Sequence, residues 1–322
     1  MTRYLARRLA VAFLLVVVVA STSLLLTRLA PGDLTAQLGV NATPQEVAEM
    51  RARYGLDRGA GEQLLFWIGR AARFDFGESF LYNRPVGALV AQAAANTAAL
   101  AAVALLAATV TGIPLGIFTG SRRRGLVPAL VRGGSILCLS LPPLVTSLVF
   151  VWFAARTGWF PVGGMSSIDA ARLGWGGWLA DLAWHLPLPV LALALPIAAT
   201  LERLQAQSMG DAVRQPFVLA ALARGLSQRQ LVLRHAWRPS LRPVCALYGI
   251  VIGALLSGSF AVEYVTAWPG LGRLMYEALR ARDIYLVAGC AAAGALFLAL
   301  GSLVSDLLLA AADPRVRDRE AA

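Results

Sequence analysis

The chain of 322 residues is 58% hydrophobic and only 15% charged, and its formal net charge is +11. Ordinary soluble domains are roughly 45–50% apolar and about 25% charged, so the composition argues against a water-soluble fold. The arginines lie in short loops between apolar runs and form no single basic face, which argues against a nucleic-acid partner. Anionic membrane lipid and a cytoplasmic protein are the expected partners.

Six apolar segments are each long enough, at about 20 residues, to cross the hydrocarbon core of a bilayer. The sequence therefore predicts an all-α integral membrane protein built as a single membrane domain over 1–322. The first segment follows three arginines as a secretory signal would, but its apolar run is longer than a signal and lacks a small-residue cleavage site, so we expect it to be kept. The predicted spans cover approximately 9–29, 95–119, 129–155, 186–206, 244–263 and 286–311.

Arginines are concentrated in the loop after the second span and in the loop 207–243 after the fourth, and such loops stay in the cytoplasm. The segment 30–94 has nearly balanced charge, and we expect it to be external, with both termini cytoplasmic. In this segment Thr43 begins a capping box that predicts a surface helix near 44–54, and an apolar-periodic stretch follows at 63–72.

The third predicted span contains Pro142-Pro143, which predicts a kink. Cysteines and histidines lie singly along the chain and show no metal-ligand or redox spacing. We therefore expect no metal, no cofactor and no catalytic residue.

The loop 207–243 is too long and too patterned to be a simple connection. An apolar, small-residue helix from Phe217 ends at Gly225, a residue suited to a left-handed cap, and Ser227 is suited to be the N-cap of a second helix. Ala220, Ala221 and Gly225 would let another surface approach closely, and Phe217 and Leu226 would be apolar anchors. An amphipathic helix pair resting on lipid headgroups is the alternative.

The segment Leu219–Gly225 is similar to the Glu-Ala-Ala-x-x-x-Gly loop of the permease subunits of ABC importers, in their dipeptide, oligopeptide and nickel group, although the leading Glu is absent. Pro239 stands where that group usually has Asn, and Asp283-Ile284-Tyr285 stands where it usually has Asp-Tyr-Pro. Other signatures of the group recur along almost the whole chain: Ala30–Asp33, Tyr54–Asp57, Phe74–Ser79, Pro85-Val86, Gly112–Gly116, His185 with Pro189 and Pro196, Glu263, Trp268–Arg273 and Asp313–Arg315.

The resemblance implies a type I importer permease, in which two permease subunits, here expected to be a heterodimer, form the pathway for a peptide or a similar solute such as nickel or glutathione. It implies two cytoplasmic ATPase subunits or domains docked on the helices of the loop 207–243, and an external solute-binding protein. The chain has no Gly-x-x-x-x-Gly-Lys-Ser/Thr loop and no lysine, so ATP hydrolysis is expected on the partner chains.

Polar residues within the predicted spans either line a pathway or join neighbouring helices. Glu263, at the outer end of the fifth span, is expected to be structural or to act in gating, with solute contact as the alternative. The candidate pathway or gating residues are Ser135, Ser140, Thr146, Ser257 and Glu263.

Two other functions agree less well with the sequence. A membrane enzyme would need a nucleophile and a base in facing spans, but neither histidine lies in a Gly-x-Ser-x-Gly or His-Glu-x-x-His context. A channel or a secondary transporter would show inverted repeats and central ionisable residues, and neither stands out.

Overall fold

The computed structural model describes residues 2–29, 43, 45, 48–49, 59–122, 124–172 and 174–312. The predicted helix near 44–54 lies largely outside these residues. So do the signatures Ala30–Asp33, Tyr54–Asp57 and Asp313–Arg315. The chain divides into two compact units. Unit 1 contains Ala98–Trp268 and the chain from Leu300, and unit 2 contains Thr2–Thr97 and Pro269–Ala299.

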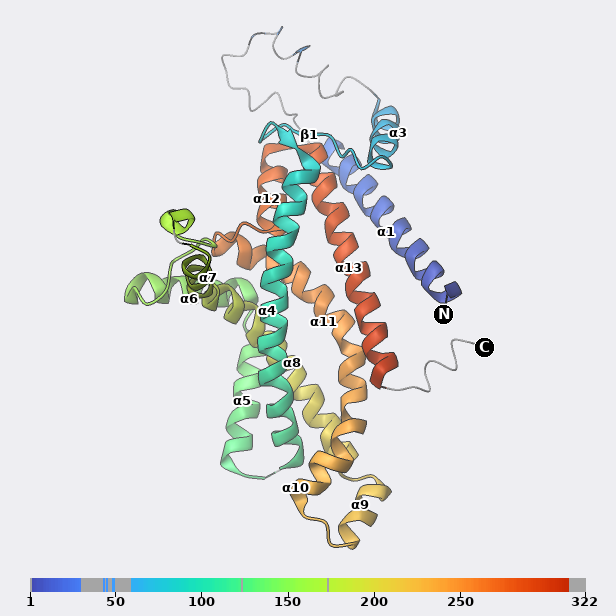
Figure 1. Ribbon diagram of the computed structural model, residues 1–322, viewed down its shortest axis with the longest axis vertical. Helices are drawn as coiled ribbons and strands as arrows, with labels where there is room; N and C mark the ends of the chain where they lie inside the picture. Colours follow the sequence, from blue (N-terminus) through green and yellow to red (C-terminus); the bar gives the residue numbers. More distant parts are fainter. Residues whose placement is uncertain are drawn as a thin grey trace. The chain divides into compact units, whose positions relative to one another are not determined.

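In its described residues, unit 2 contains helices and one short β-hairpin (Figure 1). The hairpin strands β1 (Glu78–Ser79) and β2 (Arg84–Pro85) are antiparallel, with Glu78 opposite Pro85. Its core is formed by fully buried apolar side chains from separate helices, among them Leu24, Trp67 and Leu286. The helices are α1 (Thr2–Leu29), α3 (Ala60–Ala71), the start of α4 (Val86–Ser121), α12 (Leu271–Ala281) and the first part of α13 (Ile284–Ala312).

Asp283 joins the hairpin of unit 2 to the start of α13. Its Oδ2 accepts hydrogen bonds from the Ser79 hydroxyl at 2.7 Å and from the Leu81 N–H at 3.1 Å, and its Oδ1 accepts from the Leu286 N–H at 3.1 Å. The preceding residue, Arg282, ends α12 in the left-handed conformation, with φ at 54°. The departure from Asp-Tyr-Pro therefore leaves an intact turn, in which Asp283 is 1% exposed and caps a helix.

Replacing Asp283 by asparagine should loosen this hairpin, because one carboxylate oxygen becomes an NH₂ donor that faces other donors. An unsatisfied buried partner costs about 1–3 kcal/mol, so amide exchange at Leu81 and Tyr82 should become about tenfold faster or more. Hydrogen exchange followed by mass spectrometry measures this. Asp169→Asn is the control, because Asp169 is exposed and meets Arg172 only at 3.7 Å. Equal exchange in the two variants would show that Asp283 does not hold the hairpin.

Unit 1 contains the rest of α4 and α13 and most of the remaining helices (Figure 1). Its largest core includes Leu193, Leu201 and Trp268, all nearly or completely buried. The remaining elements are α5 (Leu126–Ser140), α6 (Pro143–Thr157), the 3₁₀ helix η2 (Ile168–Arg172), α7 (Trp175–His185), α8 (Pro187–Ala212), α9 (Pro216–Ala223), α10 (Gln228–Gln230), the π-helix η3 (Leu231–Ala236) and α11 (Trp237–Val265).

Four helices in the described part of the chain are long and apolar enough to cross a membrane, or up to five if the bent pair α5 and α6 is one span. They include residues 6–27, 86–121, 187–212 and 284–307. The predicted kink at Pro142-Pro143 is a break of 101° between α5 and α6. Pro142 is extended and Pro143 begins α6, as expected for residues that cannot continue a helix from the preceding turn. The fifth predicted span falls within α11, which is not among the qualifying helices, so it stays a prediction.

Three glycines of α4 bring this helix unusually close to α8. Gly112, Gly116 and Gly120 follow one another at intervals of four residues and therefore lie on one face of α4. A Cβ at these positions would lie 2.5 Å from the Ala198 carbonyl oxygen, 2.6 Å from that of Glu202 and 2.4 Å from that of Ala206, respectively. Glycine is required here because any side chain would push the two backbones apart.

Candidate functional site

The helical hairpin formed by residues 216–236 connects two long helices of unit 1. Helix α8 ends at Ala212, and α9 begins at Pro216, a favoured residue for the first helical position. At the other end, the π-helix η3 runs directly into α11 at Trp237. A displacement of the hairpin therefore acts directly on α8 and on α11.

The turn of the hairpin has the predicted local structure. Gly225 has φ at +84°, in the left-handed region. Ser227 is the N-cap of α10, and together with Gln230 it forms a reciprocal capping box. The second helix of the hairpin does not end within the loop 207–243. The π-helix η3 runs without a break into α11, and Pro239 is the third residue of α11.

The five predicted docking residues divide between two sides of the hairpin. Ala221 is 1% exposed and packs with Val218, Leu231 and Leu226 in a small core of the hairpin's own. Phe217, by contrast, is 47% exposed, and Ala220 and Gly225 are also exposed. The sequence predicts that all five contact the partner. Their position on one side or the other depends on how α9 packs against η3, which the local sequence does not specify.

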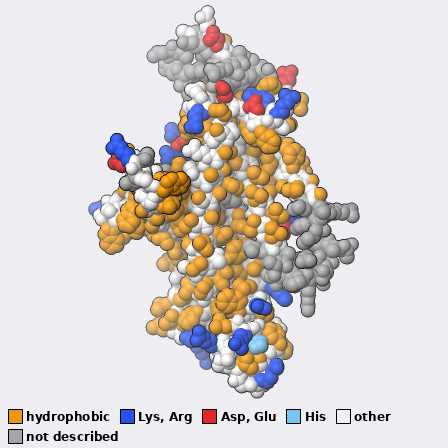
Figure 2. Space-filling model, viewed as in Figure 1, with side chains coloured by type: hydrophobic (Ala, Val, Ile, Leu, Met, Phe, Trp, Pro, Cys, Tyr) orange, Lys and Arg blue, Asp and Glu red, His pale blue; other side chains and the backbone are white. Residues whose placement is uncertain are grey.

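The outer surface of the hairpin contains further apolar and basic side chains. Leu222 is 51% exposed and Leu233 is 48% exposed. Figure 2 shows basic side chains gathered at this end of unit 1. The exposed arginines of the hairpin and of the start of α11 are Arg224, Arg229, Arg234 and Arg238.

Hydrogen bonds between buried side chains join α8 to the two neighbouring long helices of unit 1. The Thr119 hydroxyl of α4 donates to Glu202 Oε1 at 2.5 Å, and Gln205 Nε2 donates to the Ser240 hydroxyl of α11 at 2.8 Å. Glu202 is 1% exposed and Gln205 is 0% exposed. Sequence reasoning missed this polar layer, although two polar residues one turn apart near the end of a predicted span were a visible signal.

The candidate pathway residues do not form one site. Ser140 and Thr146 donate to carbonyl oxygens of their own helices, at 2.9 Å to Ile136 and at 3.0 Å to Pro143. Ser135 is buried in unit 1 and Glu263 is 0% exposed there. The side chain of Ser257 lies outside the described residues. These five residues remain candidates that no observed geometry brings together.

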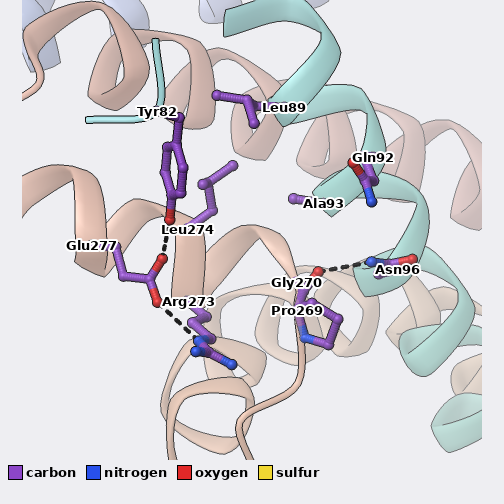
Figure 3. A pocket seen from close by; sticks show the side chains of 10 residues that line it. All are labelled: Tyr82, Leu89, Gln92, Ala93, Asn96, Pro269, Gly270, Arg273, Leu274 and Glu277. Carbon is purple, nitrogen blue, oxygen red and sulfur yellow. Dashed lines mark hydrogen bonds and ion pairs between the residues drawn. The ribbon is translucent and has the colours of Figure 1, made fainter. Parts of the chain in front are cut away.

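A pocket of about 260 Å³ in unit 2 was not predicted (Figure 3). Tyr82 donates a hydrogen bond to Glu277, and Arg273 Nε donates to the other carboxylate oxygen of Glu277 at 3.0 Å. Burial raises the pKa of the Tyr82 phenol to about 12, and the bond to Glu277 acts in the same direction. The signature Trp268–Arg273, which contains three of the lining residues, was the sequence feature that could have indicated this pocket. The lining residues are Tyr82, Leu89, Gln92, Ala93, Asn96, Pro269, Gly270, Arg273, Leu274 and Glu277.

The signature Phe74–Ser79 forms a compact turn beside the end of α3. Arg70 binds both oxygens of Asp75, at 2.8 and 2.9 Å, and the Gly77 N–H donates to Asp75 at 3.0 Å. The Arg70 guanidinium, and then the Gly77 amide, hold the pKa of Asp75 below its usual range. Gly77 itself has φ at 91°, a conformation that favours glycine. These residues have a structural role in the turn.

Within the described residues no group of three or more His, Cys, Asp and Glu side chains is placed to hold a metal ion. His185 has one such neighbour, because its Nδ1 lies 3.7 Å from Asp181 Oδ1. His185 Nδ1 is 2.8 Å from the Asp181 carbonyl oxygen of its own helix.

Comparison with known proteins decides the family. The model of the family described as "Binding-protein-dependent transport system inner membrane component" matches residues 112–318, well over half of the chain. The chain belongs to this family. The match covers the hairpin 216–236, the glycines of α4 that face α8, and the polar layer of α8. The predicted all-α membrane fold is thereby confirmed, and the permease is an inner-membrane component of a transport system.

Relatives match the permease over almost its whole length. The oligopeptide transport system permease protein OppB of Mycobacterium bovis is 32% identical over 325 residues, which cover 98% of this chain and 99% of that protein. The oligopeptide transport system permease protein AppB of Bacillus subtilis is 27% identical over 319 residues, with the same coverage of both chains. The resemblance noted from the sequence motifs is confirmed.

Proposed function

We propose that the permease is the non-catalytic transmembrane subunit of an ABC importer for peptides or a similar small solute. The observation that carries the proposal is the hairpin 216–236, which has its own small core and is continuous with α11 and nearly so with α8. Phe217, Ala220 and Gly225 lie on the side that a partner can reach, together with Leu222 and Leu233. Ala221 and Leu226 support this surface from within.

The proposed partners are a second permease subunit, two ATPase subunits or domains, and an external solute-binding protein. The family description names binding-protein-dependent transport, which supports the last of these. An apolar patch surrounded by arginines is suited to a groove with an acidic rim on the ATPase. A peptide is the proposed solute because the relatives are named as oligopeptide transport permeases.

Leu222→Ala should weaken the association with the ATPases, because Leu222 is a large exposed apolar side chain of the hairpin. Truncating an interface anchor costs about 2 kcal/mol or more, which is roughly a thirtyfold loss of affinity. The measurement is retention of the ATPases when the permease is purified from membranes that contain the whole transporter. Leu179→Ala is the matched control, because Leu179 lies on α7 and is 54% exposed.

Equal retention by the two variants would favour the alternative in which the hairpin rests on lipid headgroups. ATP turnover by the isolated, contaminant-free permease would contradict its assignment as a non-catalytic subunit.

We also propose that the hairpin 216–236 and both termini are cytoplasmic, and that η2 and α7 lie in an external loop. The arginines of the hairpin support this orientation, since positively charged loops are retained on the cytoplasmic side. In a variant without the native cysteines, a single cysteine at Ser167 should react with a membrane-impermeant maleimide in intact cells. A cysteine at Ser227 should react only after the cells are opened. The reverse pattern would invert the topology.

A further inference from the structure

A groove in unit 1 has a charged end and an apolar wall. It has a volume of about 600 Å³ and lies between α5, α8 and α11. The charged side chains exposed at it are Arg132 of α5 and Arg203 of α8. The wall is formed by Ile136, Leu139, Leu204, Ala206 and Leu247, and the other lining residues are Thr200, Glu202 and Gln207.

The charge in the groove is positive. Glu202 is the acidic residue of the lining, but it is 1% exposed and accepts a hydrogen bond from Thr119 of α4. Arg203 forms no ion pair with any side chain in the described part of the permease. Arg132 is held through its Nε, which donates to the Pro128 carbonyl oxygen at 3.2 Å. An anionic group in the groove would therefore meet the Arg203 guanidinium, whose charge no described carboxylate neutralises.

The two arginines lie close enough to the ends of their helices for their side chains to reach a lipid headgroup region. Arg132 lies six residues after the start of α5, about 9 Å along its axis, and Arg203 lies nine residues before the end of α8, about 14 Å along its axis. Both helix ends lie at the end of unit 1 that carries α9 and α10 (Figure 1). Helix α8 has 26 residues, about 39 Å, which exceeds the roughly 30 Å hydrocarbon core, so its last turns extend beyond the hydrocarbon. Long arginine side chains can reach the remaining distance to the interface.

The apolar wall distinguishes a lipid from a polar solute. Ile136 is 55% exposed and Leu139 is 38% exposed, on the same helix as Arg132 and one and two turns further from its start. This order, with charge at the interface and leucine deeper, matches the order of phosphate and acyl chain in a phospholipid. Basic pockets between transmembrane helices on the cytoplasmic side bind such headgroups.

We propose that this groove binds one anionic phospholipid, with its phosphate between Arg132 and Arg203 and an acyl chain along Ile136 and Leu139. The site requires only that the permease lies in the inner membrane, as its family does. If the hairpin 216–236 did not dock the ATPases, the proposed phospholipid site would be unaffected.

The test compares binding of phosphatidylglycerol and phosphatidylcholine to the purified transporter by native mass spectrometry. The wild type should retain phosphatidylglycerol preferentially. Each arginine near an anionic lipid surface contributes about fivefold in affinity. The variant that combines Arg132→Gln with Arg203→Gln should therefore bind phosphatidylglycerol with roughly thirtyfold lower affinity. Phosphatidylcholine binding should not change.

The control has the same change in charge: Arg156→Gln combined with Arg172→Gln, two arginines of α6 and η2. This control and the single variant Arg203→Lys, which keeps the charge, should both retain phosphatidylglycerol. Full retention by the Arg132→Gln, Arg203→Gln variant would overturn the proposal. Displacement of the bound lipid by a dipeptide, but not by the corresponding dipeptide amide, would also overturn it, because the groove would then receive the carboxylate of the solute.

Discussion

Gly116→Val is expected to separate α4 from α8 and to lower the amount of folded permease in the membrane sharply. A Cβ at Gly116 would lie 2.6 Å from both the Glu202 carbonyl oxygen and Gln205 Cβ, closer than the 3.0 Å below which real Cβ atoms essentially never lie. Valine adds two further methyl groups at this point. Overpacking costs about 1–3 kcal/mol, occasionally more, and helix backbones in contact cannot relax as a flexible side chain can.

The separation should also break the polar layer of α8. Thr119 is three residues from Gly116, on the same side of α4, and its bond to Glu202 depends on the close approach of the two helices. Glu202 would then be buried without its partner, which adds a second penalty of about 1–3 kcal/mol.

The measurement is the abundance of the permease in membranes, together with its thermal unfolding in detergent. Gly294→Val is the matched control, because Gly294 also lies within a long helix but a Cβ there would meet nothing within 4 Å. Gly116→Ala should fall between the two. If Gly116→Val were as abundant and as stable as Gly294→Val, the close contact between α4 and α8 would not exist in the membrane.

The parts of the fold that sequence reasoning predicted well depend on local signals. Gly225 and Ser227 show why: a left-handed turn and a capping box are determined by neighbouring residues, and the structure has both. The break at Pro142-Pro143 is local too, since it follows from a missing N–H and a ring clash. Its size, 101°, depends on what α5 and α6 pack against, and proline alone does not determine it.

The parts that could not be predicted depend on residues far apart in the sequence. Glu202 meets Thr119 because glycines allow α4 to approach α8, and Gln205 meets Ser240 because α11 packs against α8. The pocket of unit 2 likewise brings Tyr82 to Glu277, 195 residues later. In the hairpin, Ala220 and Ala221 are identical residues with opposite exposure, which is determined by the packing of α9 on η3.

Gly225→Val should abolish coupled uptake while leaving the permease inserted in the membrane. The residue has φ at +84°, which a β-branched side chain can adopt only with strain on the order of 1–2 kcal/mol. A Cβ at Gly225 would meet nothing within 4 Å, so the expected effect comes from the backbone and not from a clash within the chain. The turn would shift to relieve the strain, and α9 would leave the position set by Val218, Ala221 and Leu231.

A shifted α9 matters because of where the hairpin is attached. In the proposed arrangement, the exposed residue Phe217 would no longer face the ATPase at the angle that the small core imposes, so closure of the ATPases would not be transmitted to α8 and α11. Solute uptake should fall to near background. Gly225→Asn should keep much of it, because asparagine tolerates the left-handed region better than any β-branched residue.

The measurement is solute uptake together with ATPase retention and permease abundance for the wild type, Gly225→Val and Gly225→Asn. Gly59→Val is the control outside the hairpin, where φ is −57° and a Cβ would meet nothing within 4 Å. Full uptake and full ATPase retention by Gly225→Val at normal abundance would mean that the hairpin is not the coupling surface. Loss of uptake in Gly225→Val with full retention of the ATPases would instead place the defect in transmission through α8 and α11, after docking.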